Sequence, residues 1–563
     1  MATHVSAIEY HERTKHSPES VRAGATGLDW ENKPLPYKIY EDRPTIELPE
    51  KLTLPDDPTL SVLAADEVAP DDESRPTDSR RPDLPEPRRP DLGDLARLCH
   101  YAVGVTRVIE RRGTEHHFRA AATTGALYHV DCYVVAGDLA DLDAGVHHFD
   151  PRSHAFDVLR EGDFRGVLVE ASGREPAVAD APAVVVTTST WWRNAWKYGD
   201  RTYRHAFWDS GTSLANLLAV ARVLDLPAQL VTGFADGTVA DLLGVDPAEE
   251  APLELVPIGS GGAPAPDPPA VDRIDPTTRP LSDEVIEHPL IVNAYETSAL
   301  ADGSEVRAWR SRGGEESGST SADATSADAT SADATSTESL PDDPPSTDST
   351  PTEPASADPT TVSDGERIEL DPVDRETASK RPLEATIGRR GSCRRYRRDS
   401  VSFRMLSTLL DRAIRPVPLD VGSPAEACPF TEPYLIVNDV EGLTPGSYRY
   451  DVGSTSLELL REGWFRREAA HLALDQRLAM DAAVCVFFMA DLDTVVAKLG
   501  DRGYRVAQLE AAIAAGRLYL ATYAHRDLGA TGLTFYDDVV SSFFEPHAAG
   551  TTPMFCWTVG RPA

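Results

Sequence analysis

Two stretches that lie far apart in this sequence resemble each other closely enough to indicate an internal duplication. Residues 199–234, GDRTYRHAFWDSGTSLANLLAVARVLDLPAQLVTGF, align with residues 500–535, GDRGYRVAQLEAAIAAGRLYLATYAHRDLGATGLTF. A second pair supports the first: GVHHFDPRSHAFDVLREGDFR, from Gly145, matches GSYRYDVGSTSLELLREGWFR, from Gly446. Two copies in one chain predict an intramolecular pseudo-dimer, packed as two identical subunits would be.

Composition divides the chain around these copies. With 563 residues the chain is too long for one ordinary core. Residues 1–90 are polar and Pro-rich, which predicts an extended N-terminal arm and linker, and residues 91–299 form the first globular region. Residues 300–367 include SADAT three times in tandem, and so few apolar side chains predict a disordered acidic linker. Residues 368–563 form the second globular region.

Charge and cysteine usage restrict the classes of protein that this chain can belong to. The formal net charge is −36, with seven Lys against 48 Arg, which suits a protein kept hydrated in a halophilic cytoplasm, although the acidic linker contributes. Such a field repels phosphates and argues against nucleic-acid binding. The six cysteines show no CxxC spacing, so we expect reduced thiols in a cytoplasmic protein. We find no secretory signal and no apolar run of the ~18 residues that a membrane span needs.

The most concentrated basic motif is RRGSCRRY, which precedes a helix-like stretch in the second region. Arg389, Arg390 and Arg394 could offer guanidinium donors to a phosphate, and the hydroxyl of Ser392 adds another. The alternative is a solvated basic face, or a patch that attracts acidic partners. In a chain of such negative charge, the phosphate site is the better interpretation.

Three further motifs are individually weak. AAATTGALY contains Thr123, Thr124 and Gly125 and enters a strand, so its small residues would let the backbone approach a flat ring. Lys197 and Tyr198 carry groups that can transfer protons, although such a pair is more often a surface lysine beside a half-buried tyrosine. Gly532 follows a strand and would permit close backbone approach, or simply make a turn. The paired histidines at 116–117 and 147–148 point to opposite strand faces, so no metal site is expected.

Together these motifs resemble the SagB/ThcOx-type dehydrogenases within the FMN-dependent nitroreductase superfamily. The family's phosphate arm, approximately Arg-Arg-x-Ser-x-Arg, is matched by Arg390, Ser392 and Arg394. Its ring-contacting loop, approximately Ala-Pro-Ser-Ala-Gly-Ala-Leu-Tyr-Pro, is similar to Ala122–Tyr128 with Thr in place of Pro and Ser. The resemblance implies an α+β fold with two nitroreductase-like domains, each a mainly antiparallel sheet flanked by helices, and it implies bound FMN.

The two copies depart from the family pattern in complementary ways. The first lacks the arm, and PEPRRPDLGDL stands in its place. The second lacks the loop and reads Lys498-Leu499 where the first has the Lys-Tyr pair associated with azoline oxidation. In the superfamily FMN lies between two subunits, so we expect one composite site: Arg389, Arg390, Ser392 and Arg394 at the phosphate, Gly532 at the ring edge, Arg561 as a further charge, and Thr123, Thr124 and Gly125 over the ring.

The resemblance leaves three functions open. In an azoline dehydrogenase acting on a modified peptide or small molecule, Lys197 or Tyr198 would be the base. The first alternative is an NAD(P)H-dependent nitroreductase or flavin reductase. The second is a non-catalytic scaffold that binds a partner through the flavin fold.

Overall fold

The first repeat is built on an antiparallel sheet of six strands in the order β1-β6-β5-β4-β7-β8. The computed structural model describes residues 4–24, 27–64, 88–111, 113–314, 365, 367–374, 380–422 and 428–563. The strands of this sheet are β1 (Thr45–Glu47), β4 (Val130–Ala136), β5 (Gly145–Asp150), β6 (Ala155–Glu161), β7 (Ala183–Thr190) and β8 (Glu250–Ile258). A separate hairpin joins β2 (Val105–Arg111) to β3 (Thr114–Arg119).

The second repeat has the corresponding antiparallel sheet, in the order β10-β18-β16-β12-β14-β15-β9, with β17 also paired to β18. Its strands are β9 (Arg367–Glu369), β10 (Tyr396–Arg397), β12 (Glu432–Val437), β14 (Gly446–Asp451), β15 (Ser456–Glu462), β16 (Val484–Ala490), β17 (Gly529–Leu533) and β18 (Thr552–Pro562). Two short parallel strands, β11 (Val401–Ser402) and β13 (Val440–Glu441), lie apart. The predicted fold class, mainly antiparallel sheet flanked by helices in two copies, is therefore confirmed.

The aligned hairpins share even their irregularity. The β5–β6 pair changes register between Val146 and His147, and the β14–β15 pair changes register between Ser447 and Tyr448. These are the positions that the sequence alignment equates. A bulge at the same place in both copies is a structural record of the duplication.

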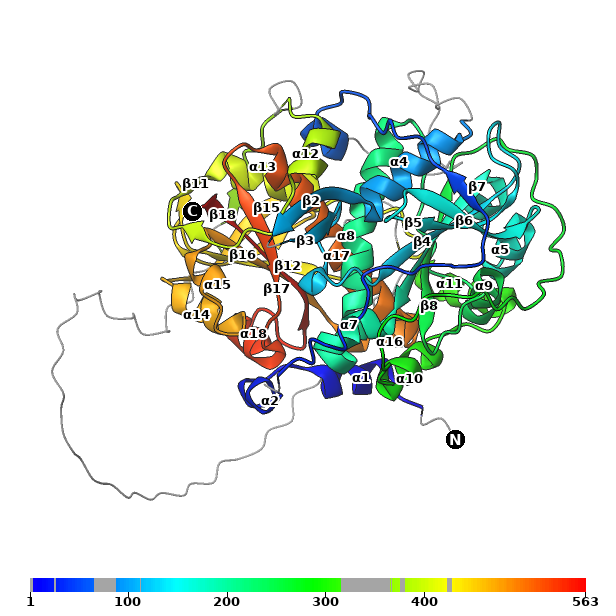
Figure 1. Ribbon diagram of the computed structural model, residues 1–563. Helices are drawn as coiled ribbons and strands as arrows, with labels where there is room; N and C mark the ends of the chain where they lie inside the picture. The colour runs from blue at the N-terminus through cyan, green and yellow to red at the C-terminus, as the bar shows by residue number, and fades with distance from the viewer. Residues whose placement is uncertain are drawn as a thin grey trace. The chain divides into compact units, whose positions relative to one another are not determined.

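Eighteen α-helices lie among the described residues. They are α1 (Ala7–Thr14), α2 (Pro18–Ala23), α3 (Thr59–Ala64), α4 (Leu92–Val103), α5 (Arg165–Ala171), α6 (Pro176–Asp180), α7 (Trp191–Tyr198), α8 (Thr202–Val223), α9 (Asp236–Leu243), α10 (Pro289–Thr297), α11 (Gly303–Gly314), α12 (Leu383–Arg389), α13 (Phe403–Ala413), α14 (Arg466–Leu472), α15 (Arg477–Asp481), α16 (Leu492–Leu499), α17 (Arg502–Ala524) and α18 (Asp537–Phe544). Figure 1 draws α8 and α17 in the middle, between the two sheets. Both helices are buried on nearly every face, which explains why neither is amphipathic.

Helices α8 and α17 pack against each other along a pseudo-twofold axis. A Cβ atom added to Gly211 would lie 2.5 Å from that of Ala512, and one added to Gly516 would lie 2.5 Å from that of Ala215. The rings of Tyr203 and Tyr504 stack with centroids 6.4 Å apart. In each of these pairs a residue meets its own aligned counterpart, over several helical turns, so the two helices run parallel. The predicted pseudo-dimer is present within one chain.

The repeated Gly-Asp-Arg motif holds the two repeats together through buried ion pairs. Arg201 and Arg204 of the first repeat both contact Asp537 of the second, at 3.0 and 2.6 Å. All three side chains are buried, and the two guanidinium groups hold the pKa of Asp537 well below its usual range despite burial. The sequence at Asp537 and Asp538 is typical of a solvated turn or a helix start; Asp537 is indeed the first residue of α18, but its side chain is buried and not solvated.

The equivalent ion pairs join arginines of the second repeat to an aspartate of the first. Arg502 and Arg505 bind Asp236 of the first repeat at 2.6 and 2.7 Å. Asp236 and Asp537 are the first residues of α9 and α18, and they occupy aligned positions. An unpaired charge would be costly at such a depth, so the arginines of each repeat compensate the buried aspartate of the other.

The duplication also includes the N-terminal segment. The amide of His16, just after α1, donates to Asp537 Oδ2 at 2.8 Å, and the amide of Asp537 donates to the His16 carbonyl at 3.1 Å. Leu300, just after α10, makes the same two contacts with Asp236, at 2.9 and 3.1 Å. The segment at α10–α11 is thus the counterpart of α1–α2, so the second repeat begins before the predicted linker.

Part of the predicted linker is consequently folded. Residues Gly303–Gly314 form α11, with Val306 and Trp309 buried, so the prediction of disorder from residue 300 was wrong for this helix. Residues 315–364, which contain the SADAT repeats, lie outside the described residues. The predicted N-terminal arm likewise contains three helices, α1 to α3.

Candidate functional site

The small-residue loop of the first repeat is fixed by hydrogen bonds to a buried carboxylate. The Thr124 amide donates to both oxygens of Asp209, at 2.9 and 3.0 Å, and its hydroxyl donates to Oδ2 at 3.0 Å. Gly125, Ala126 and Tyr128 have φ values of +61°, +54° and +53°. Such backbone persists only when its surroundings determine it, and here Asp209 on α8 does so.

The loop lies directly against Tyr198. A Cβ atom added to Gly125 would lie 2.8 Å from the Tyr198 hydroxyl oxygen. Position 125 therefore requires glycine both for its left-handed backbone and for this approach. The predicted ring loop and the predicted catalytic pair thus belong to one site.

The pKa values of Lys197 and Tyr198 are shifted in opposite directions. Burial, with a smaller contribution from Asp209, raises the pKa of Tyr198 above its ordinary value. Partial desolvation, followed by the positive charges of Arg394 and Lys33, lowers the pKa of Lys197. The Lys197 ammonium lies 4.9 Å from the centre of the Tyr198 ring. Tyr198 is therefore suited to keeping a proton, and Lys197 to accepting one.

The Arg cluster of the second repeat reaches this loop of the first. Arg390 donates through Nε to the carbonyl of Ala120 at 2.8 Å and through Nη2 to that of Arg119 at 2.9 Å. Arg394 lies close enough to act on both Lys197 and Tyr198. Phosphate arm and ring loop, predicted from different copies, are brought together.

Ser392 and Gly532 lie at the same edge of the second sheet. Ser392 forms a parallel bridge with Ala530 on β17, and the Cys393 amide donates to the Ala530 carbonyl at 2.8 Å. Gly532 is two residues further along that strand, and its amide donates to the Tyr519 hydroxyl. This places the predicted ring-edge glycine beside the predicted phosphate arm.

Two predicted residues have other partners. The Arg389 guanidinium donates to the carbonyls of Tyr523, His525 and Arg526, where it caps the end of α17. Arg561 donates to the Ser400 carbonyl at 2.8 Å and pairs with Asp527. Neither arrangement directs its guanidinium toward the loop.

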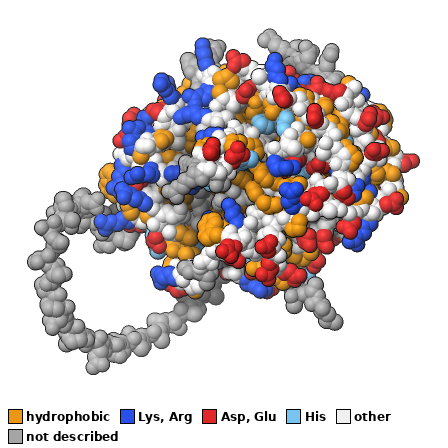
Figure 2. All heavy atoms as spheres, in the orientation of Figure 1, with side chains coloured by type: hydrophobic (Ala, Val, Ile, Leu, Met, Phe, Trp, Pro, Cys, Tyr) orange, Lys and Arg blue, Asp and Glu red, His pale blue; other side chains and the backbone are white. Residues whose placement is uncertain are grey.

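The remaining donors fit a phosphate. Within the described ranges, the side chains of Ser392 and Arg394 have no hydrogen-bond partner, and Arg394 is exposed. On the face drawn in Figure 2, acidic side chains are spread widely, whereas basic ones gather over β11 and the C-terminal end of the chain. A hydroxyl and an unpaired guanidinium beside Arg390 form the donor set that an FMN phosphate would need.

The pseudo-symmetric position in the second repeat is filled by the protein itself. Leu499, the counterpart of Tyr198, accepts a hydrogen bond at its carbonyl from the buried indole of Trp309, at 2.8 Å. Asp420 accepts from the amide of Gly233 at 3.0 Å and pairs with Arg310 at 3.0 Å. Side chains of α11 thus lie against the counterpart of Tyr198, whereas the counterpart of the ring loop, at 423–427, lies outside the described residues.

Sequence reasoning missed the network that supports the loop. His129 Nε2 lies 2.9 Å from Asp209 Oδ2, and Asn194 donates to the Thr124 hydroxyl at 2.7 Å. One signal was available: the alignment pairs Asp209 with Glu510, and Glu510 also receives a hydrogen bond, at 2.7 Å, from the Thr431 hydroxyl that precedes β12. Carboxylates at matching positions of two almost fully buried helices indicate a shared supporting role.

Other classes of site find no support in the described part of the chain. No group of three or more metal-binding side chains occurs there. None of the helices described is long and apolar enough to cross a membrane. The six cysteines are all buried and unpaired.

Comparison with known proteins agrees with the fold. A family model described as the Nitroreductase family matches residues 86–260 and 387–545, more than half of the chain. Two similar proteins bear the name putative nitroreductase. One, from Methanocaldococcus jannaschii, is 27% identical over 168 residues, which cover 30% of this chain and 80% of that protein. The other, a crystal structure from Anabaena variabilis, matches with a TM-score of 0.70 and 24% identity over the whole of both chains.

A further relative has a name that specifies a process. The trifolitoxin-processing protein TfxB of Rhizobium leguminosarum bv. trifolii is 29% identical over 175 residues. The match covers 30% of this chain and 47% of TfxB, so it spans about half the length of that relative.

Proposed function

Because the chain belongs to the nitroreductase family, a family of flavin-type oxidoreductases, we propose that it is an FMN-dependent oxidoreductase with one composite flavin site. The contact of Arg390 with the carbonyls of Arg119 and Ala120 is the observation that carries this proposal. It joins the arm kept by one repeat to the loop kept by the other. The pseudo-symmetric position is occupied by Trp309, Arg310 and Asp420.

The residues of the proposed site have two roles, cofactor binding and proton transfer. Ser392, Arg394 and the remaining Nη1 donor of Arg390 hold the phosphate, and Thr123, Thr124 and Gly125 cover the ring, with Gly532 near its edge. When bound, FMN supplies hydride transfer, and the protein orients the substrate and moves protons. Tyr198 donates a proton or hydrogen bond, and Lys197 accepts a proton from the substrate.

We propose a modified peptide with an azoline ring, or a small molecule of that kind, as the substrate. The Lys-Tyr pair supports this class, and so does the name of TfxB, a trifolitoxin-processing protein. The alternative is an NAD(P)H-dependent nitroreductase or flavin reductase, which the names of the other relatives favour. Rapid bleaching of the flavin by NADPH alone, measured by stopped flow, would favour that alternative. The buried, unpaired cysteines suit a cytoplasmic location.

Flavin stoichiometry tests the composite site. The purified chain should bind one FMN, and the double variant Arg390→Ala/Arg394→Ala should lose at least tenfold in affinity while its circular dichroism is unchanged. Arg397→Ala is the matched control, because Arg397 is exposed in the same segment and pairs only with Asp399 among the described carboxylates. Two tightly bound FMN per chain, or full binding by the double variant, would contradict the proposal. A protein that binds no flavin would be a scaffold.

Catalytic variants test the roles of the proton-transfer pair. We expect Tyr198→Phe and Lys197→Met each to lower kcat by about 10²- to 10⁴-fold, the usual contribution of a general acid or base, with FMN content unchanged. Because the pKa of Lys197 is lowered, the rise of activity with pH should occur below the ordinary lysine range. That rise should disappear in Lys197→Met and persist in Tyr198→Phe. The same pH profile in both variants would remove Lys197 from the mechanism.

A further inference from the structure

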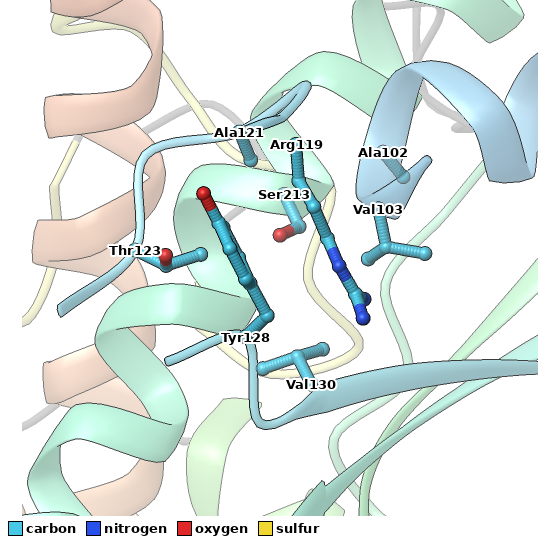
Figure 3. Close-up of a pocket in the computed structure, with 8 residues that line it drawn as sticks. All are labelled: Ala102, Val103, Arg119, Ala121, Thr123, Tyr128, Val130 and Ser213. Carbon is cyan, nitrogen blue, oxygen red and sulfur yellow. The ribbon is translucent and has the colours of Figure 1, made fainter. Parts of the chain in front are cut away.

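A small pocket lies inside the first repeat, behind the ring loop. Its lining includes the end of α4 at Ala102 and Val103, the side chains of Arg119, Thr123 and Tyr128, and Ser213 of α8. Figure 3 shows the Arg119 and Tyr128 side chains lying next to each other, with the Ser213 hydroxyl in the same space. The space inside it that a water-sized molecule can occupy is about 10 Å³.

Arg119 is a buried cation in this pocket with unused donors. The residue is 3% exposed, and its guanidinium lies between the rings of Tyr37 and Tyr128, with centroids 5.2 and 5.1 Å away. Nη2 donates to the Pro36 carbonyl, but Nε and Nη1 have no partner among the residues that the structure describes.

No described carboxylate forms an ion pair with Arg119. The largest opposing charge that acts on Arg119 is that of Asp131, but that carboxylate is already in a buried ion pair with Arg193 at 2.8 Å. Burial lowers the pKa of Arg119, which is the sign of a charge held without sufficient compensation. A cation buried in this way is costly unless an anion joins it.

A second unused donor lies in the same pocket. The Thr123 hydroxyl is buried and has no partner within the described ranges. The Ser213 hydroxyl uses its proton on the Asp209 carbonyl, at 2.8 Å. The pocket therefore offers one buried cation and one hydroxyl, between apolar walls, and no acidic group in its lining.

We propose that this pocket binds a small monovalent anion, a halide or a simple carboxylate, as the counter-ion of Arg119. Its cavity volume of about 10 Å³, against the ~300–1,000 Å³ of pockets for larger ligands, leaves room for a species of very few atoms and excludes a nucleotide or a flavin. The pocket shares Thr123 with the proposed flavin site, but its cation is separate from that site, because the Arg119 carbonyl faces Arg390 whereas its side chain enters this pocket. The bound anion orders the loop through Thr123.

Thermal unfolding of the full chain tests the proposal. The melting temperature is measured as chloride or formate replaces gluconate, an anion too large for the pocket, at constant ionic strength. We expect a saturable rise with at least one small anion. The rise should be lost in Arg119→Met and kept in Arg107→Gln, which removes an equal charge from an exposed position on the same hairpin. Saturation by chloride alone identifies a free halide, and saturation by formate alone identifies a carboxylate-bearing ligand.

Two further measurements keep the test decisive if Arg119→Met fails to fold. Thr123→Val should weaken the anion dependence several-fold, and a crystal soaked in bromide should show an anomalous peak beside Arg119. A melting temperature that responds equally to gluconate and to the small anions would overturn the proposal. So would an anion dependence that is identical in the wild type and Thr123→Val, or a soaked crystal without that peak, because the pocket would then hold only water.

Discussion

At the scale of single residues, buried carboxyl groups are stabilised in two opposite protonation states. Asp537 is surrounded by guanidinium groups and is held in its charged form. Glu254 is equally buried, but among the described residues its carboxyl receives hydrogen bonds only from the hydroxyls of Ser210 and Thr187. Desolvation raises its pKa to about 7, so the neutral acid is the form that the fold favours.

Glu254 should make stability depend on pH. Its folded pKa lies above its unfolded value, so its contribution is complete below about pH 4.5 and is lost as pH rises through 7. At 1.36 kcal/mol per unit, the contribution is about 3 kcal/mol. We expect the free energy of unfolding in urea to decrease between pH 5 and pH 8 in the wild type. In Glu254→Gln this decrease should be smaller by about 3 kcal/mol. The exposed Glu249→Gln is the control, and equal pH dependence in all three proteins would refute the assignment.

Asp537 should behave in the opposite way. Removing one partner of a buried ion pair leaves uncompensated charge and costs about 3–5 kcal/mol. Asp537→Asn should therefore destabilise the chain by about that amount in chemical denaturation at pH 7, and Asp236→Asn should do the same. Asp538→Asn, at an exposed neighbouring position, should cost less than 1 kcal/mol. A loss below about 1 kcal/mol for Asp537→Asn would mean that the cluster does not stabilise the interface between repeats.

At the scale of elements, the contact between α8 and α17 depends on glycine. The Cβ of Gly211→Ala would meet that of Ala512 at 2.5 Å. Overpacking of this kind costs about 1–3 kcal/mol, against a gain of up to about 1 kcal/mol in helix propensity. We therefore expect Gly211→Ala to destabilise the protein, whereas Gly237→Ala in α9, where nothing lies within 4 Å, should be neutral or stabilising.

A double variant makes this prediction specific. In Gly211→Ala combined with Ala512→Gly, the methyl group moves to the other helix of the same pair, so more than half of the lost stability should return. The free energies of unfolding of both single variants and the double variant form a cycle. Strict additivity would show that the two residues do not meet.

Several elements could be predicted from the sequence, and others could not. The long helices and the β5–β6 and β14–β15 hairpins were recognisable because their aligned segments are long. The counterpart of α1–α2 was missed because α10–α11 is short and is followed by residues 315–364, which separate it from the rest of its repeat. The role of Asp236 and Asp537 was also out of reach, since an aspartate at a helix start is ordinarily solvated and only the packed pair shows which arginines face it.

The same limit applies to the site. The motifs of the arm and the loop came from residues adjacent in sequence, and the structure brings them together. Arg389, adjacent to the motif, and Arg561, expected as a further charge, are engaged by nearby carbonyls and by Asp527. Asp209 carries no motif, and only its hydrogen bonds to Thr124 reveal it. Whether an arginine is free to bind a ligand depends on neighbours that a linear pattern does not specify.

At the scale of the whole molecule, the two repeats complete each other. The described residues on either side of 315–364 form one compact unit, in which each repeat neutralises the buried charges of the other. Residues 1–314 and 365–563, expressed together as separate chains, should therefore associate, copurify and bind one FMN between them. Residues 365–563 alone should be insoluble or unfolded, because Arg502, Arg505 and Asp537 would lack partners. Independent folding of both fragments, without association, would contradict this description.

The filled position around Trp309 has a consequence for how such a molecule can change. In a dimer of identical subunits, every substitution appears twice and alters both sites at once. In this chain the two members of each pair, such as Gly211 and Ala512 or Tyr198 and Leu499, are encoded separately. A substitution can therefore alter one of the two pseudo-symmetric positions, as Trp309 does beside Leu499, and leave the other unchanged, so the two positions can diverge within one molecule.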